Sequence, residues 1–431
     1  MSSPLDSFAL PESVREHDYV IASYHLTLPT DADVMKRVAR FAVGQTTGTW
    51  LPVPGLTDEM RRRHEGRVVS VVSVPPLDTL PSDPVATLGY IVRIALPTIN
   101  FGASLPMLLT TVLGNDSSTS VEAKLVDLEV PESMSSRFAG PSFGVDGLRR
   151  LTAVQDRPLL LNMIKPCTGL TPENARDIFR ETALGGIDLI KDDELIADAG
   201  YSPVVERVRL FTQAAREAAG ETGIETIYIP NVTDRPDRML ETAWRAVDAG
   251  ARAVMATYAT VGYGGLEALS ESVNVPVLAH FAAAAPYFEG PSTGMSAPIT
   301  MGLLPRLAGA DMALVTTPYG GYPIRPLQYL RTAHQLLLPR PGIAPALPVI
   351  GGGVHPGTVQ RYISELGTDI VLGAGGAIQG HPDGAAAGVR AMRQAVEAAL
   401  SGVSAAEAAA AHPELHKAIS LWGVLETPAS G

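Results

Sequence analysis

From residue 159 onward the chain repeats one pattern, and this repeat constrains the fold more than any other feature. Each repeat has a short apolar run rich in β-branched residues, then a loop with polar or glycine residues, then an amphipathic helical stretch. The candidate strands are residues 159–165, 187–191, 226–230, 253–258, 275–280, 312–316, 348–351 and 369–372. Eight strand–helix units predict a (β/α)8 barrel, a fold that takes about 250 residues.

The helical stretches between these strands carry their own start signals. Four of them, residues 172–184, 203–219, 236–249 and 326–338, open on a proline. The first helical turn tolerates proline because the N–H that proline lacks has no partner there. The prolines therefore favour helices at these positions and support the alternating order of strands and helices.

The first part of the chain has a different organisation. Strands are predicted near residues 19–28, 67–74, 89–96 and 123–128, with helices near 31–42 and 105–113. This order predicts an antiparallel α+β (ferredoxin-like) domain. A turn-rich stretch at 140–144 is a plausible linker. We therefore expect an N-terminal α+β domain at 1–148 and a TIM-barrel catalytic domain at 149–431, whose tail includes a helix at 403–411.

Composition excludes several classes of partner. The formal net charge is −12, and the triplet 61–63 is the one visible arginine cluster, which argues against a nucleic-acid footprint. The single cysteine, Cys167, excludes an internal disulfide or a multi-cysteine zinc site and fits a reducing compartment. No apolar run reaches the roughly 18 residues of a membrane helix. We expect a cytoplasmic protein that binds neither nucleic acid nor membranes.

In such barrels the working residues lie at the C-terminal ends of the strands. The second predicted strand ends in Lys191, Asp192, Asp193 and Glu194. Side chains alternate along a strand, so Lys191 and Asp193 share one face, Asp192 points away, and Glu194 can join from the loop. Carboxylate oxygens together with substrate and water oxygens suit Mg²⁺. The alternative is a solvated acidic turn.

Two further strand ends are rich in glycine. Gly352 and Gly353 follow the seventh strand, and Gly375 and Gly376 follow the eighth. Loops at these positions are the usual phosphate site of the fold, because bare backbone N–H groups can surround an anion. The alternative is that these glycines serve tight turns alone.

Single reactive side chains end two other strands. Lys165 could contact a phosphate or carry a proton, and its alternative is a surface salt bridge. His280 could orient a group or shuttle a proton, and its alternative is a structural histidine. Cys167 has no visible activating base and is interpreted as a wall residue rather than a nucleophile.

Taken in order, these landmarks resemble the RuBisCO large-chain superfamily over nearly the whole chain. The motifs that carry the resemblance are TGTW at 47–50, IKP at 164–166, GGID at 185–188 running into KDDE at 191–194, GGVH at 352–355 and GHP at 380–382. The resemblance implies that Lys191 takes up CO2 as a carbamate, which binds Mg²⁺ together with Asp193 and Glu194. Mg²⁺ would then polarise a carbonyl and stabilise an enediolate.

The same resemblance assigns the other groups. Lys165 would be the active-site lysine of the first strand, and Gly353, Gly375 and Gly376 would form the cradle for one phosphate. Thr49 and Trp50 would reach the site from a partner subunit, which implies a homodimer or a multiple of dimers.

Departures from the RuBisCO pattern concern carbon fixation and the second phosphate. The loop after the sixth strand, 316–322, reads TTPYGGY and lacks the lysine that positions CO2 in RuBisCO, so carboxylation is not expected. Phe281 replaces the phosphate-binding arginine, Cys167 the second lysine of the first strand, and Gly44 the small-domain glutamate. The resemblance therefore implies a monophosphate substrate and the RuBisCO-like group called form IV.

Three reactions and one non-catalytic role remain open. Methionine-salvage enolases resemble the chain at 100–101 and 108–112, but their proton-abstracting lysine falls at Thr98. Decarboxylation or cleavage of a 3-oxo sugar-acid phosphate is our first expectation, because a decarboxylation generates its enolate by losing CO2 and does not need that base. The alternatives are a 2,3-diketo-5-methylthiopentyl-1-phosphate enolase, a methylthioribulose-phosphate isomerase, and a sugar-phosphate sensor, for which the metal-binding triad would be unnecessary.

Overall fold

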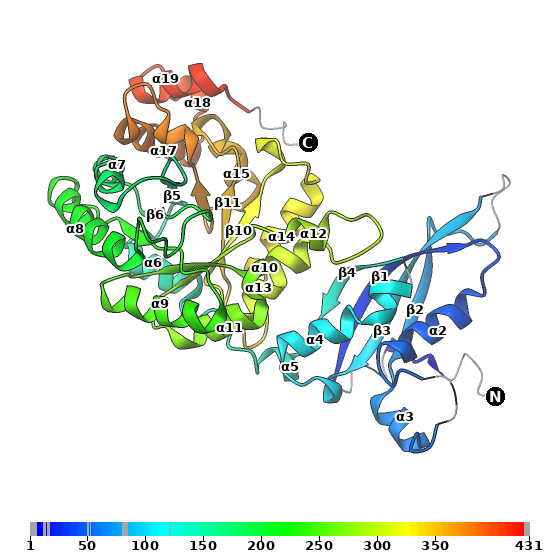
Figure 1. Ribbon diagram of the computed structural model, residues 1–431. Helices are drawn as coiled ribbons and strands as arrows, with labels where there is room; N and C mark the ends of the chain where they lie inside the picture. The colour runs from blue at the N-terminus through cyan, green and yellow to red at the C-terminus, as the bar shows by residue number, and fades with distance from the viewer. Residues whose placement is uncertain are drawn as a thin grey trace. The chain divides into compact units, whose positions relative to one another are not determined.

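The computed structural model describes residues 7–11, 14, 18–49, 51, 53–79, 85–120 and 122–425. Contacts within the chain divide it into two units, each considered by itself (Figure 1). Unit 1 comprises Met1–Phe138, Ala284–Thr300 and Arg340–Ile343, and unit 2 comprises Ala139–Ala283, Met301–Pro339 and Ala344–Gly431. The predicted domain boundary between residues 148 and 149 stays a prediction.

Unit 1 is built on a four-stranded antiparallel sheet with the ferredoxin-like order β2-β3-β1-β4. Its strands are β1 (Tyr19–Pro29), β2 (Arg67–Val74), β3 (Thr87–Pro97) and β4 (Ala123–Glu129). Its helices are α2 (Val34–Gly44), α3 (Asp58–His64), α4 (Leu105–Val112), α5 (Glu132–Ser135) and α12 (Ala285–Phe288), with a short η2 (Thr98–Asn100). Side-chain caps start the two longer helices, at Asp33 for α2 and Ser104 for α4. The predicted α+β fold is confirmed.

Unit 2 is a (β/α)8 barrel. Its strands are β5 (Leu159–Met163), β6 (Leu189–Lys191), β7 (Ile227–Ile229), β8 (Val254–Thr257), β9 (Val277–His280), β10 (Met312–Thr316), β11 (Leu347–Gly351) and β12 (Val371–Gly373). Their order is β7-β6-β5-β12-β11-β10-β9-β8, all paired parallel, and a bridge between Asn231 and Met255 joins the two ends. All eight predicted strands are confirmed.

Helices surround this barrel. The longer ones are α6 (Gly144–Thr152), α7 (Pro172–Leu184), α8 (Val204–Thr222), α9 (Pro236–Asp248), α11 (Tyr263–Ser272), α14 (Pro326–Leu337), α15 (Val359–Leu366), α17 (Ala385–Leu400) and α19 (Pro413–Trp422). Shorter ones are α10 (Tyr258–Val261), α13 (Leu304–Leu307), α16 (Gly376–Gln379) and α18 (Ala405–Ala408). Of the described helices, none combines the length and the apolar character needed to cross a membrane.

The tail corrects one expectation. The helix predicted at 403–411 is reduced to α18, which starts at a capping box between Ser404 and Glu407. A second helix, α19, then starts at Pro413 and was not predicted. The alanine-rich composition indicated helix but could not locate the break, which the polar caps and the proline determine.

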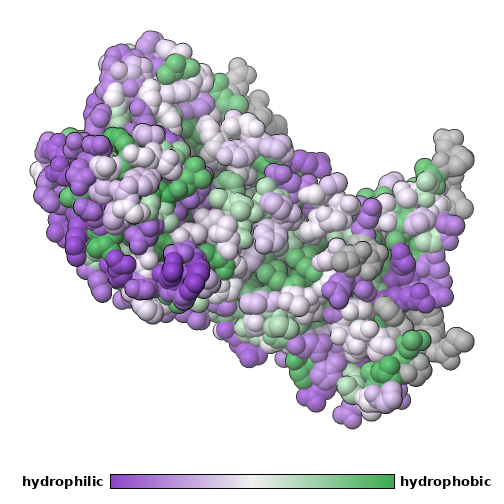
Figure 2. Space-filling view, viewed as in Figure 1, coloured by the Kyte–Doolittle hydropathy of each residue, from purple (hydrophilic) through white to green (hydrophobic). Residues whose placement is uncertain are grey.

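The barrel encloses an apolar core, and the helices around it present a more polar surface. Inward-facing residues from strands around the barrel, such as Leu161, Leu189 and Leu314, form one buried cluster. The outer face over α7, α8 and α9 is largely hydrophilic (Figure 2). There Arg176 pairs with Glu217 at 2.8 Å between α7 and α8.

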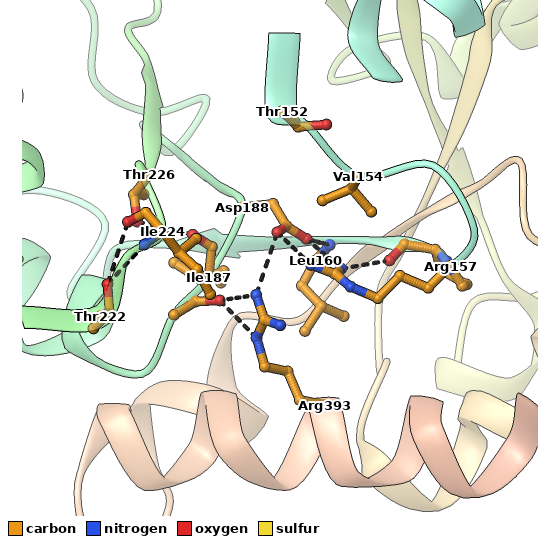
Figure 3. Close-up of polar contacts among 12 residues, drawn as sticks. Thr152, Val154, Arg157, Leu160, Ile187, Asp188, Thr222, Ile224, Thr226 and Arg393 are labelled. Atoms are coloured by element: carbon orange, nitrogen blue, oxygen red, sulfur yellow. Dashed lines mark hydrogen bonds and ion pairs between the residues drawn. The ribbon is translucent and has the colours of Figure 1, made fainter. Parts of the chain in front are cut away.

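A buried carboxylate holds the N-terminal end of the barrel strands together (Figure 3). Asp188, directly before β6, is 1% exposed and accepts both arms of the Arg157 guanidinium at 2.7 and 2.8 Å. It also accepts the backbone N–H of Leu160 at the start of β5 and lies 3.4 Å from Arg393 of α17. One side chain therefore links two strands and an outer helix. Because this end of a barrel is remote from catalysis, we interpret the cluster as structural.

Asp188→Asn is expected to lower the free energy of unfolding of the barrel by about 3 kcal/mol, because it leaves Arg157 half-buried without its charge partner. Urea unfolding followed by circular dichroism measures this. The matched control is Asp383→Asn, which breaks the exposed pair with Lys417 and should cost less than about 1 kcal/mol. Equal losses in the two variants would contradict the interpretation.

Candidate active site

One cavity of about 440 Å³ opens at the C-terminal ends of the barrel strands. It is lined by every barrel residue that was predicted to be catalytic, metal-binding or phosphate-binding, namely Lys165, Lys191, Asp193, Glu194, His280, Gly352, Gly353, Gly375 and Gly376. Cys167, predicted to be a wall residue, does not line it and instead borders a smaller neighbouring cavity. A volume in this range suits a small metabolite. The barrel thus gathers groups that are up to 211 residues apart in a single pocket.

Lys191 is the last residue of β6 and is fully buried. Its Nζ donates to the Asp192 carbonyl at 2.9 Å and lies 3.9 Å from Oε2 of Glu194. Burial lowers the pKa of Lys191, and the surrounding carboxylates oppose the shift only in part. A larger share of uncharged amine is the consequence.

Asp193 and Lys165 form the closest ion pair of the pocket. The Lys165 Nζ lies 2.6 Å from Oδ2 of Asp193 and donates to Sγ of Cys167 at 2.9 Å. Burial alone would lower the pKa of Lys165, but the hydrogen bond and charge of Asp193 raise it above its usual value. Lys165 is therefore an ammonium group held at the mouth of the barrel, and Cys167 is a neighbour of that group.

His280 and Glu194 lie next to each other in the pocket. The Nε2 of His280 lies 3.3 Å from Oε2 of Glu194, and its Nδ1 accepts the backbone N–H of Ala282 at 3.1 Å. Burial, assisted by the charge of Lys191, lowers the pKa of His280 well below its ordinary value. The ring is then neutral with its proton on Nε2, so it can donate a hydrogen bond toward the pocket.

The side chain of Asp192 points away from the pocket and holds the end of β6 in place through hydrogen bonds. Its carboxylate accepts from Arg207 at 2.8 Å, from the Tyr228 hydroxyl at 2.6 Å and from the Asn231 backbone N–H at 2.9 Å. Arg207 also donates to the Tyr228 hydroxyl at 3.1 Å. All of these side chains are buried. The network holds β6, β7 and α8 in register, and with them the direction of Lys191 and Asp193.

The glycine loops form the opposite wall of the pocket. The backbone amides of Gly352, Gly353, Gly375 and Gly376 bond to no other described residue. An added Cβ on Gly353 would lie 2.3 Å from the Gly320 Cα, so only glycine fits there. A Cβ on Gly375 would lie 3.7 Å from Cε of Lys165, which places the lysine beside these amides. The loops can therefore bind an anion next to a cation.

Aromatic side chains close the remaining side. The rings of His280 and Phe281 stack with centroids 5.3 Å apart, and the ring of Tyr322 meets Phe281 edge-on at 6.3 Å. Tyr322 also covers Gly352, since a Cβ there would lie 2.3 Å from its ring. This part of the pocket offers apolar surface rather than charge.

The loop after β10, which carries Tyr322, is held by contacts with α15. The hydroxyl of Tyr319 donates to Glu365 at 2.6 Å and accepts from Arg361 at 2.9 Å, and the Arg361 guanidinium lies 5.0 Å from its ring centroid. Gly320 packs directly on the backbone of Gly352. Contacts on both sides thus hold this segment against the glycine wall.

Several lining residues were not among the predicted site residues, and the polar or aromatic ones include His355, Tyr322 and Trp422. His355 has a buried Nδ1 without a partner among the described residues, and burial lowers its pKa. It belongs to the GGVH motif, which was a usable signal. Trp422 comes from the unpredicted helix α19, so nothing in the strand pattern could have identified it.

Two further residues, Thr49 and Trp50, were predicted to reach the site from a partner subunit. Thr49 lies in unit 1, where its hydroxyl contacts only the backbone of Leu51 among the described residues. Trp50 lies outside the described residues. The part of these residues in substrate binding stays a prediction.

Two family profiles match this chain. The profile of the ribulose bisphosphate carboxylase large chain, catalytic domain, matches residues 144–322 and 339–422. The profile of its N-terminal domain matches residues 9–134. The chain belongs to the RuBisCO large-chain family. The resemblance carried by the sequence motifs is therefore confirmed.

Similar proteins place it among the RuBisCO-like members. A ribulose bisphosphate carboxylase-like protein of Archaeoglobus fulgidus is 41% identical over 91% of this chain and 90% of its own length. A 2,3-diketo-5-methylthiopentyl-1-phosphate enolase of Geobacillus kaustophilus is 37% identical over 95% of this chain and 99% of its own.

Solved structures show the same fold. The rubisco-like protein of Alicyclobacillus acidocaldarius superposes with a TM-score of 0.87 at 36% identity, covering 94% of this chain and 100% of that one. A dimeric archaeal Rubisco of Hyperthermus butylicus gives a TM-score of 0.85 at 29% identity, covering 98% of this chain and 100% of that one.

Tyr228→Phe is expected to lower the free energy of unfolding of this RuBisCO-like chain by about 2 kcal/mol, because it removes a buried hydrogen bond to the charged Asp192. The matched control is Tyr258→Phe, since the Tyr258 hydroxyl is buried without a partner among the described residues. Urea unfolding should show little change for the control. If both variants lose the same stability, the network does not hold the strand end.

Proposed function

We propose that this RuBisCO-like chain is a Mg²⁺-dependent enzyme that forms an enolate from a phosphorylated keto compound and does not fix CO2. One observation carries the proposal. A single cavity brings Lys191, Asp193 and Glu194 together with the ammonium of Lys165 and the glycine amides. Oxygen ligands, a cation and an anion site are the groups that such a reaction requires.

The residues present fit a carbamate and Mg²⁺. No three histidine, cysteine, aspartate or glutamate side chains of the described part of the chain are grouped so that they could hold a metal ion. A carbamate on Lys191 would add oxygen ligands beside Asp193 and Glu194 and complete a hard-oxygen set. The buried amine with its lowered pKa supports this addition, because the uncharged amine is the form that reacts with CO2.

Each side chain then has a chemical task. Bound Mg²⁺ would polarise the substrate carbonyl and stabilise the negative charge of the enolate. The amides of Gly353, Gly375 and Gly376 would bind the phosphate and so orient the keto group. The Lys165 ammonium would neutralise developing charge or donate a proton to the enolate. Neutral His280 would donate a hydrogen bond from Nε2 to a substrate oxygen.

Loss of CO2 from a 3-oxo sugar-acid phosphate, or its cleavage, is the route we favour. Loss of CO2 forms the enolate from the electron pair of the broken carbon–carbon bond, so this step needs no general base. Thr98 has a hydroxyl that donates to the Asp18 carbonyl at 2.9 Å, and a hydroxyl is a poor base at neutral pH. Lys165 is held as an ammonium by Asp193 and so lacks the free lone pair of a base.

A second candidate is the tautomerisation of 2,3-diketo-5-methylthiopentyl-1-phosphate. The wall of Phe281 and Tyr322 favours it, because an apolar substrate end suits aromatic surface better than a hydroxylated one. The Geobacillus kaustophilus relative is a 2,3-diketo-5-methylthiopentyl-1-phosphate enolase, which points the same way. Isomerisation of methylthioribulose phosphate would use the same wall.

We also propose that the enzyme works as a homodimer or a multiple of dimers in the cytoplasm. The dimeric Rubisco of Hyperthermus butylicus, similar over 98% of this chain, supports the assembly. In a dimer, Thr49 and Trp50 of a partner subunit could complete the pocket.

The first experiment is a substrate screen of the purified protein with Mg²⁺ and bicarbonate. Phosphorylated 3-oxo acids, 2,3-diketones and ketoses are supplied in turn, and product mass and CO2 release are recorded. We expect turnover of a 3-oxo acid phosphate with CO2 release, abolished by Lys191→Ala. Turnover of a diketone phosphate without CO2 would make the enolase correct. Silence across the panel would favour a sugar-phosphate sensor.

The control separates catalysis from folding. Lys191→Ala should also lose Mg²⁺ binding and the incorporation of ¹³CO2 seen by NMR, whereas Lys417→Ala, on the exposed face of α19, should retain both. If Lys191→Ala retains both, the carbamate assignment is wrong whatever the activity.

The aromatic wall gives a separate prediction on selectivity. Phe281→Ala should lower kcat/KM about tenfold for a substrate with an apolar end and change it little for one with a hydroxylated end, because about 1–2 kcal/mol of apolar contact is lost. Paired kinetics on the two substrate types test this, with the exposed Leu327→Ala of α14 as control. Equal losses for both types would show that the wall does not select.

A further inference from the structure

A second cavity, of about 680 Å³, lies within unit 1 and is lined by three arginines. Arg62 and Arg63 come from the last turn of α3, and Arg137 follows α5. Thr98 and Ile99 of η2 form another wall. The cavity therefore brings together cations from segments that are 75 residues apart in the chain.

These three guanidinium groups are not neutralised within the described part of the chain. Neither a salt bridge nor a side-chain hydrogen bond joins any of them to another described residue, including Asp18, the acidic side chain of the wall. The neighbouring Arg61, in contrast, pairs with Glu65 at 3.0 Å. In a chain of net charge −12, three cations that have no partner among the described residues surround one cavity, and this favours a local site for an anion.

The walls of this cavity are tied to one another. The Nδ1 of His64 and the Oδ1 of Asn100 are 2.7 Å apart, and the Asn100 amide donates to the His64 carbonyl at 2.8 Å. Both the backbone N–H and the hydroxyl of Thr98 donate to the Asp18 carbonyl at 2.9 Å. Helix α3, η2 and the start of β1 are thus held together without a ligand. A pre-arranged site loses less entropy on binding.

We propose that this cavity binds a phosphoryl group, either free phosphate or the phosphate of a metabolite. A guanidinium group pairs with phosphate oxygens through two parallel hydrogen bonds. Several guanidinium groups together suit a phosphate dianion better than they suit a single, monovalent carboxylate. The volume leaves room for the rest of a small metabolite beside its phosphate. The residues that line this cavity and those that line the barrel pocket do not overlap, and the argument for this site does not use the proposed reaction.

The test maps arginine reactivity in the full-length protein. Phenylglyoxal modifies free guanidinium groups, and peptide mass spectrometry gives the rate at each arginine, with and without inorganic phosphate at constant ionic strength. We expect Arg62, Arg63 and Arg137 to react about tenfold more slowly when phosphate is at ten times its Kd, because only the unliganded site reacts. Arg209 and Arg216, exposed on α8, are the internal controls and should not slow.

Each result is decisive. Absence of protection, or equal protection of Arg209 and Arg216, overturns the proposal. Equal protection by succinate at the same concentration shows a general anion site and overturns the phosphoryl assignment.

A variant pair provides a second test. The double variant Arg62→Gln/Arg63→Gln should abolish the protection of Arg137 by phosphate. The double variant Arg209→Gln/Arg216→Gln changes the net charge by the same amount and should leave the protection of Arg137 intact. Circular dichroism verifies that both proteins are folded. Persistent protection of Arg137 in the first variant would mean that the arginines do not act as one site. Free phosphate and phosphorylated metabolites are distinguished by repeating the mapping with a sugar monophosphate.

Discussion

The alternation of side chains at the end of β6 is the constraint on which the pocket depends. Lys191 and Asp193 face the cavity, and Asp192 between them faces Arg207 and Tyr228. If the strand end rotated by one residue, a carboxylate paired with an arginine would enter the pocket and the buried lysine would leave it. The hydrogen bonds behind the strand are therefore as important to the site as the residues that line it.

The opposite wall depends on close backbone packing. Gly320, Gly352 and Gly353 approach so closely that an added Cβ would clash with backbone atoms or with the Tyr322 ring. Among the described residues the glycine amides have no hydrogen-bond partners, and Tyr322 packs against Phe281 at the same wall. One packing requirement thus produces both an anion site and an apolar surface.

Charge is distributed differently in the two units. In the barrel pocket, cations and carboxylates lie within hydrogen-bonding distance of each other, as Lys165 and Asp193 do at 2.6 Å. In the unit 1 cavity, Arg62, Arg63 and Arg137 have no such partners among the described residues. The first arrangement suits proton and charge movement during a reaction, and the second suits the binding of an anion.

The sequence by itself determined the eight strands, the principal helices that open on proline, and the fact that Lys165, Lys191, His280 and the glycines end strands. It did so because period-two and helical apolar patterns are local, and because parallel strands of a barrel end at one rim. Tertiary structure alone decided which neighbours those groups meet: Asp193 for Lys165, Glu194 for His280, and Tyr322 for Phe281. It also brought Trp422 and the arginines of unit 1 to their cavities. These contacts join residues far apart in the chain, and their geometry depends on the packing of whole elements, which local patterns do not encode.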